Sequence, residues 1–235
     1  MMRGNIFLIP NTLGSDNWQS VLPADVVAKV DTCKHFAVEN VRTARRFLKK
    51  LNPEIVIDDL FFYVLDKHTP FHEVEKMIQV ILQGESMGII SEAGCPGIAD
   101  PGSELVRLAH RNSIQVIPLV GPSSLFLALM ASGLNGQSFV FHGYLPIPKA
   151  ERQRALREIE RSIEQNGSTH LFIEAPYRNN PLLEDILSTC KPGLLLCIAK
   201  NITLPDEFIA TKPISDWRKQ KVDLHKQPSI FLLGR

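Results

Sequence analysis

One loop constrains the fold more than any other segment of this chain. The apolar run Met87–Ile90 is followed by Ser91–Gly102, which contains three glycines and two prolines, and a helical pattern begins near Ser103. Glycine lets the backbone approach a ligand closely, and proline fixes a loop without needing an N–H partner. A strand that ends in such a loop usually brings backbone groups to a small molecule at the carboxyl edge of a sheet. The loop has neither a Walker motif nor the geometry of a G-x-G-x-x-G fingerprint, so a plain turn stays an open alternative.

The order of the apolar segments predicts an α/β protein. In the first half, strand-like and helix-like segments alternate, and this order favours a mostly parallel sheet. The expected strands are 5–9, 87–90 and 114–117, and the expected helices are 41–51, 74–82, one from Ser103 and a buried one over 124–130. Asn40 is the expected N-cap of the helix over 41–51.

The pattern changes after Gly136. Strands are expected at 139–142, 170–174, 194–199, 208–211 and 230–233, with helices over 150–165 and from Asn180-Pro181. In the second helix Asn180 is the expected cap and Pro181 the first helical residue. The last strands are close together in sequence, so antiparallel pairing is expected. We therefore predict two α/β lobes, 1–118 and 119–235, the first with a mostly parallel sheet and the second with a mixed sheet.

Composition limits the class of protein. The chain has 235 residues, 44% hydrophobic and 22% charged, with a net charge of +1. This balance argues against a surface that is basic throughout, although local basic patches are compatible with it. The four cysteines form neither a C-x-x-C pair nor a zinc-binding spacing, and the first residues do not resemble a signal peptide. We therefore expect reduced thiols, a cytoplasmic location and no bound metal. We also expect no membrane association, because no apolar run reaches the ~18 residues of a membrane span.

Several segments together resemble a known family. Ser91–Gly102, followed by Ile117–Ser124, is similar to the tetrapyrrole-methylase superfamily of S-adenosylmethionine (SAM) methyltransferases. The resemblance is strongest to the branch that methylates a cytidine ribose 2′-hydroxyl in small-subunit ribosomal RNA. Further segments agree in order and spacing, namely Pro10–Asp16, Val38–Thr43, Phe139–Pro146 and Phe172–Arg178.

The resemblance implies a bilobal fold with the cofactor in a cleft between the lobes, and a homodimer is expected with it. It implies that SAM contacts residues matching the family's cofactor segments. In the first half and at the lobe boundary these are Pro10, Gly94, Cys95, Pro96, Ile98, Ser123 and Ser124. On the adenine side they are Tyr144, Leu145, Ala175 and Ala199. From the residues alone, Ser123 and Ser124 are equally compatible with a helix cap.

Glu39 and Arg42 are the candidate catalytic residues. A ribose hydroxyl is a weak acid, so a base or a hydrogen-bonding network should assist its reaction. Relatives usually have Glu-Asp-Thr-Arg where this chain has Glu39-Asn40-Val41-Arg42, and they have aspartate where it has Glu92. The alternative interpretation of Glu39 is an acid at a helix start, where it interacts favourably with the helix dipole.

Two basic segments are candidates for contact with RNA phosphates, although such charge runs often belong to a merely solvated face. They are Arg42, Arg45, Arg46, Lys49 and Lys50 in one helix, and Lys149, Arg152, Arg154, Arg157 and Arg161 in the other.

Three functions follow from the sequence. The first is ribosomal RNA ribose methylation, with ribosomal RNA or the small ribosomal subunit as partner. The second is methylation of a tetrapyrrole such as a precorrin, or of another small molecule. The third is SAM or RNA binding without catalysis.

Overall fold

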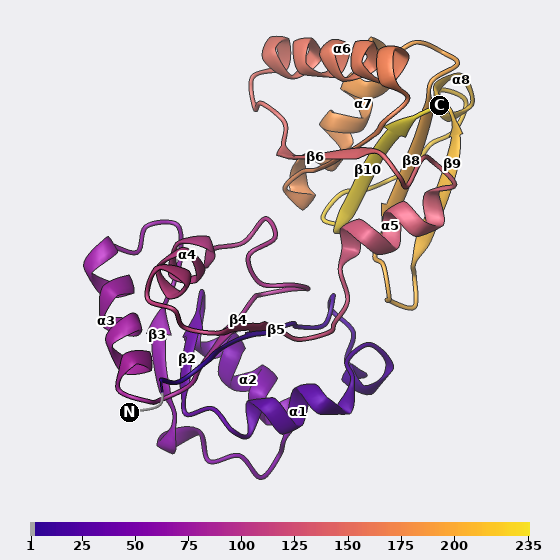
Figure 1. The fold of residues 1–235 in the computed structure, drawn as a ribbon. Coiled ribbons are helices and arrows are strands. Elements are labelled where there is room, and N and C mark those ends of the chain that lie inside the picture. The colour runs from indigo at the N-terminus through magenta and orange to yellow at the C-terminus, as the bar shows by residue number, and fades with distance from the viewer. Residues whose placement is uncertain (1–2) are drawn as a thin grey trace. The chain divides into compact units, whose positions relative to one another are not determined.

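The chain forms two compact units, which divide between Ser123 and Ser124 in a computed structural model that describes residues 3–235 (Figure 1). Each unit has one five-stranded sheet and its own apolar core. The predicted α/β class is confirmed, with a parallel sheet in the first unit and a mixed sheet in the second.

In the N-terminal unit the strand order is β3-β2-β4-β1-β5, and every neighbouring pair is parallel. The strands are β1 Ile6–Ile9, β2 His35–Val38, β3 Phe61–Val64, β4 Met87–Ile90 and β5 Val116–Pro118. The helices are α1 Ala24–Val30, α2 Val41–Leu51, α3 Phe71–Leu82 and α4 Ser103–Arg111, with short 3-10 turns at Trp18–Ser20 and Ile57–Asp59.

Both faces of this sheet are buried, as parallel sheets require. On one face Phe7, Ile9 and Phe36 form a cluster with side chains of α1 and α2. On the other, Ile6 and Met87 pack with side chains of α3 and α4. Figure 1 shows these two helix pairs on opposite sides of the strands. The apolar spacing that predicted α2 and α3 is therefore the spacing that buries them.

In the C-terminal unit the strand order is β6-β7-β10-β8-β9. β6 and β7 are parallel, and the other three pairs are antiparallel. The strands are β6 Phe139–Tyr144, β7 Thr169–Ile173, β8 Leu195–Lys200, β9 Phe208–Pro213 and β10 Ser229–Gly234. The helices are α5 Ser124–Ser132, α6 Lys149–Asn166, α7 Asn179–Thr189 and α8 Ile214–Trp217, with a 3-10 turn at Pro176–Arg178. Side chains of α6 and α7 form the core with this sheet.

Two local predictions were wrong. α5 was expected to be buried throughout, but Phe126 is 51% and Met130 is 79% exposed. The helix is apolar on all sides, and only its Ala128–Leu129 side is buried. Asn180 was expected to cap α7, yet the helix begins at Asn179. The Asn180 side chain instead accepts from the Leu224 N–H and donates to Asp223, so it joins two distant segments.

No helix within residues 3–235 is both long and apolar enough to cross a membrane. Over the same residues, no group of three or more histidine, cysteine, aspartate and glutamate side chains is arranged to hold a metal ion.

Candidate functional site

The Gly/Pro loop after β4 is bound to the loop after β1 at the carboxyl edge of the N-terminal sheet. The Asn11 N–H donates to the Gly94 carbonyl at 2.9 Å, and the Gly94 N–H donates back at 3.2 Å. The Asn11 side-chain amide also donates to the carbonyls of Ser91 and Glu92, at 3.0 and 3.1 Å. Within the loop, the Ser91 hydroxyl donates to the Gly94 carbonyl at 2.7 Å. Five hydrogen bonds therefore fix the backbone of the loop that the sequence analysis expected to contact a ligand.

The segment after β5 joins the same edge. A Cβ on Gly121 would lie 2.3 Å from ring atoms of Pro10, so this close approach requires glycine. The Cys95 thiol lies 3.4 Å from the Pro122 carbonyl oxygen, and burial raises its pKa. The thiol therefore stays protonated and can donate to that carbonyl. The structure brings together Pro10, Cys95 and the segment leading to Ser123.

Gly94 holds a backbone conformation with φ +71°. A Cβ there would meet the Leu13 side chain at 3.2 Å and the Pro122 carbonyl at 3.4 Å. Pro96 is buried beyond it, whereas Ile98 is exposed. Ser123 and Ser124 are half-buried and stand on either side of the boundary between the units.

Glu39 and Arg42 lie where β2 gives way to α2. The Asn40 side chain accepts from the N–H groups of Arg42 and Thr43 at 2.9 and 3.3 Å, which confirms it as the N-cap of α2. The Thr43 hydroxyl donates to the Glu92 carboxylate at 2.6 Å, so the first turn of α2 is joined to the loop after β4. Arg42 is exposed, and Glu39 is half-buried.

The edge is electrostatically acidic. Burial raises the pKa of Glu39, and the charges of Asp100, Glu92 and Asp66 raise it further. Burial also raises the pKa of Asp100 to about 6, with a contribution from Glu92. The ionised forms of Glu39 and Asp100 are thus destabilised by burial and by neighbouring negative charge, and a positively charged ligand near them would relieve that repulsion.

Sequence reasoning missed Asp100 and Asn11 as site residues. Asp100 stands in Ala99-Asp100-Pro101, inside the loop already singled out, so its acidic side chain was an available signal. Asn11 offered no such signal, because its role depends on hydrogen bonds to residues about 80 positions away.

A cavity of about 550 Å³ lies beside the loop after β4, lined by Leu8, Pro96, Gly97, Ser103, Val106, Arg107, His110 and Arg111.

The C-terminal sheet also gathers its predicted residues at one edge. Tyr144 ends β6 opposite Ile173, the last residue of β7, and Leu145 and Ala175 follow these strands. Ile230 of β10 pairs with both Ile173 and Ala199, which places Ala199 at the same end. Tyr144 is 59% exposed, whereas Leu145 and Ala199 are buried. The four residues expected on the adenine side therefore lie along one edge of this sheet, with β7 and β10 between Tyr144 and Ala199.

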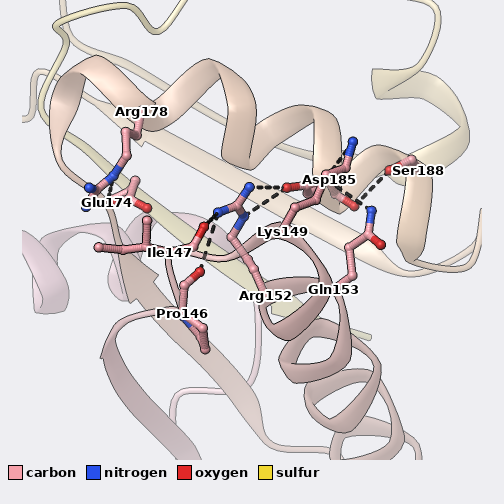
Figure 2. A network of polar contacts seen from close by, with 9 residues as sticks. All are labelled: Pro146, Ile147, Lys149, Arg152, Gln153, Glu174, Arg178, Asp185 and Ser188. Atoms are coloured by element: carbon pink, nitrogen blue, oxygen red, sulfur yellow. Dashed lines mark hydrogen bonds and ion pairs between the residues drawn. The ribbon is translucent and has the colours of Figure 1, made fainter.

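Arg152 was predicted to contact phosphate, and this prediction was wrong. Its guanidinium is buried and pairs with the equally buried Asp185, with Nε at 2.8 Å from the carboxylate (Figure 2). Nη1 donates to the Ile147 carbonyl at 2.6 Å. Arg152 therefore holds the loop that follows Tyr144 and is not available to solvent.

His142 of β6 is exposed, yet its ring makes a hydrogen bond within the protein. Its Nε2 lies 2.7 Å from Nδ1 of the buried His170, whose other ring nitrogen is 3.0 Å from the Ser168 hydroxyl. Burial and the proximity of His142 lower the pKa of His170 to about 4. The pair is therefore neutral near pH 7.

Sequence comparison finds curated relatives that share one name, "Ribosomal RNA small subunit methyltransferase I". The protein of that name from Streptococcus pyogenes is 31% identical over 205 residues, which are 87% of this chain and 67% of the relative. The one from Vibrio cholerae is 29% identical over 211 residues, which are 90% of this chain and 69% of the relative. No family model matches the chain.

Solved structures share the fold. The methyltransferase CobJ has a TM-score of 0.65 and 16% identity, covering 99% of this chain and 94% of its own. The uroporphyrin-III C-methyltransferase from Thermus thermophilus, solved with S-adenosylhomocysteine, has a TM-score of 0.59 and 14% identity, covering 99% and 98%. At these identities the likeness concerns the fold.

Proposed function

The chain belongs to the ribosomal RNA small subunit methyltransferase I family, and we propose that it uses SAM to methylate a ribose 2′-hydroxyl of small-subunit ribosomal RNA. The observation that carries this proposal is the carboxyl edge of the N-terminal sheet. There the loop around Gly94 is fixed to Asn11, and Glu92 in that loop is joined to the helix that begins after Glu39.

This edge suits SAM in shape and charge. A Cβ on Gly94 would crowd Leu13 and the Pro122 carbonyl, so glycine lets these segments approach closely, and the fixed loop holds its remaining N–H and C=O groups in place. The carboxylates of Glu39, Glu92 and Asp100 favour a cation nearby. When bound, SAM supplies a methyl group made electrophilic by its positively charged sulfur. The C-terminal residues Tyr144, Leu145, Ala175 and Ala199 are proposed as adenine contacts.

Glu39 is proposed as the general base. Its raised pKa brings the carboxylate closer to the working pH, which makes it a better acceptor for the hydroxyl proton. Arg42 is exposed one turn further along and is proposed to hold a neighbouring phosphate. Glu39 would accept the proton of the reacting hydroxyl as the oxygen takes the methyl group, and the broken carbon–sulfur bond would leave its electron pair on sulfur, giving neutral S-adenosylhomocysteine.

The exposed cations of α2 are proposed to contact further phosphates. Arg42, Arg45 and Arg46 are exposed, and the Arg45 guanidinium also lies 5.2 Å from the centre of the Phe62 ring. Lys50 is engaged inside the protein, donating to the Ser15 carbonyl at 2.8 Å. In α6, Arg154 pairs with Glu158 and Arg152 is buried, although Arg157 and Arg161 are exposed. We therefore propose α2 as the main phosphate contact and α6 as the lesser one.

A homodimer is proposed through an apolar surface of the C-terminal unit. Phe126 and Met130 of α5 are exposed together with Phe139 and Val140 of β6, and the two phenylalanine rings are in edge-to-face contact. β6 is also an edge strand of its sheet. Contiguous exposed apolar side chains usually mark an association surface.

A protein that modifies ribosomal subunits works where ribosomes are made, so we also propose a cytoplasmic location.

One assay separates this function from its alternatives. Purified protein and methyl-labelled SAM are incubated with small ribosomal subunits, bare ribosomal RNA or tetrapyrroles, and the methylated nucleoside is identified after digestion. Label in a 2′-O-methylated nucleoside supports the proposal. Label in a tetrapyrrole would favour the small-molecule alternative. Binding of SAM and RNA without label transfer would favour a non-catalytic protein.

A further inference from the structure

Tyr177 is exposed to solvent in the turn that follows strand β7 of the C-terminal unit. It stands in the 3-10 turn Pro176–Arg178, which follows β7 and precedes α7. The residue is 60% exposed. The Arg178 guanidinium carbon lies 5.2 Å from the centre of the tyrosine ring. The guanidinium covers one face of the ring, and the exposure of Tyr177 leaves the other face accessible.

Arg178 is held in this position by a buried carboxylate. Nε and Nη2 donate to Glu174 Oε1 at 3.0 and 2.6 Å, as Figure 2 shows, and the side chain of Glu174 is 1% exposed. The same oxygen accepts the Ala175 N–H at 2.7 Å. Nη1 of Arg178 lies 3.2 Å from the Tyr177 hydroxyl. Ring and guanidinium are therefore ordered before any ligand arrives, which reduces the entropy lost on binding.

The surroundings of Tyr177 add apolar surface and positive charge. Tyr144, at the end of the neighbouring strand β6, is 59% exposed, and Ile147 in the loop held by Arg152 is 63% exposed. The exposed Lys226 donates its backbone N–H to the Pro176 carbonyl at 2.9 Å, which places a lysine beside the turn. Glu174 is shielded from solvent and paired, so it opposes an approaching anion only weakly.

We propose that Tyr177, backed by Arg178, is a stacking platform for an unpaired nucleotide of the substrate RNA. The inference rests on the proposed function and assigns part of its RNA contact to the turn after β7. Aromatic rings and guanidinium planes are the groups on which proteins stack splayed RNA bases, and nearby lysines contact the phosphates. A base in a continuous duplex is already stacked on both sides, so this platform selects single-stranded RNA. Glu174 is a positioning residue that orients Arg178.

The test compares RNA affinities of full-length variants by fluorescence anisotropy, with a short labelled single-stranded RNA and a duplex of the same sequence. Tyr177→Ala should weaken single-strand binding by about 5- to 150-fold, which corresponds to the loss of one stacked base. Its duplex affinity and its SAM affinity should be unchanged. Tyr177→Trp should retain single-strand binding, because indole offers an equivalent ring. Phe71→Ala is the matched control, since Phe71 is an exposed aromatic residue of α3 at 47% exposure.

Equal single-strand affinity of the Tyr177→Ala variant and the unaltered protein would overturn the platform. Equal losses of affinity for the single strand and the duplex would also overturn it. A change in sedimentation of the Tyr177→Ala variant would overturn it as well, because it would show that Tyr177 lies in a protein interface. If the unaltered protein methylates ribosomal RNA while Tyr177→Ala binds normally, the platform fails and the proposed function stands. If the unaltered protein binds no RNA, both fail.

Discussion

The Thr43 hydroxyl donates a 2.6 Å hydrogen bond to the carboxylate of Glu92, and so connects the start of α2 to the loop after β4. Glu92 is also one of the charges that raise the pKa values of Glu39 and Asp100. One carboxylate thus joins the segment of the proposed base to the loop of the proposed cofactor contacts.

Glu92→Gln should lower the pKa of Glu39. Removing a negative neighbour makes ionisation of Glu39 easier, so the proposed base becomes active at lower pH. The acidic limb of the pH profile of kcat/KM should therefore move to lower pH. Thr43→Ala is the control, because it removes the hydrogen bond without removing the charge. An unmoved limb in Glu92→Gln would mean that neither Glu39 nor Asp100 controls the rate.

Glu39→Gln should reduce single-turnover methylation by about 10²–10⁴-fold, the usual contribution of general-base assistance. SAM affinity, measured by calorimetry, should be nearly unchanged. Arg42→Ala should instead weaken RNA binding. If Glu39→Gln kept its rate and lost only about 0.3–1 kcal/mol of stability, Glu39 would be just a favourable charge at a helix start. Asp100→Asn is the companion variant, and a larger loss there would transfer the role of base to Asp100.

Gly94→Val should abolish SAM binding, because its side chain would press on Leu13 and the Pro122 carbonyl and displace the loop that is proposed to contact SAM. Gly97→Val is a matched control. Gly97 has a similar positive φ of +78°, so the backbone strain is comparable, but no atom lies within 4 Å of its Cβ position. Calorimetry with SAM and S-adenosylhomocysteine measures both variants. Equal affinity losses would attribute the effect to backbone strain rather than to crowding around position 94.

Replacing Arg45, Arg46 and Lys49 together with glutamine should flatten the salt dependence of RNA binding. Each lost phosphate contact removes about 0.9 from the log–log slope on duplex and about 0.7 on a single strand. Lys50→Gln should leave the slope unchanged, because Lys50 already donates to Ser15 and pairs with Asp16. A constant slope in the triple variant, with its melting temperature retained, would show that this face of α2 is merely solvated.

Asp185→Asn should destabilise the C-terminal unit by about 3–5 kcal/mol, since it leaves the buried Arg152 without its counter-charge. The double variant Arg152→Met/Asp185→Leu should be much less destabilised, because it leaves no unpaired charge. Chemical denaturation monitored by circular dichroism measures both. A double variant as unstable as the single one would show that the hydrogen bond from Arg152 to Ile147 matters more than the charge.

The sequence predicted what depends on local pattern. Val74, Met77 and Ile78 have helical spacing, and the structure buries them in α3. The Gly/Pro loop was correctly expected after β4, and Asn40 was correctly expected as a cap. Local chemistry decides such features: which side chains share a helix face, and which oxygen reaches the first N–H groups.

Features decided by distant partners were predicted less well. Arg152 belongs to a basic run that resembles a solvated face, and its burial is explained by Asp185, on a different helix, and by the Ile147 carbonyl. α1 and the edge strand β3 were not predicted, because short segments carry a weak periodic signal. The exposure of Phe126 and Met130 depends on which side of α5 faces its own sheet, which hydrophobicity alone does not specify.

The position of β10 in its sheet has a consequence for synthesis on the ribosome. β10 is formed by Ser229–Gly234 and is the last element in the order of the chain, yet in its sheet it lies between β7 and β8. All strands of the N-terminal unit precede residue 123, so that unit can fold while translation continues. The other sheet lacks an inner strand until Gly234 has left the exit tunnel. Nascent chains stalled before that point should contain one folded half and one half still open to chaperones and proteases.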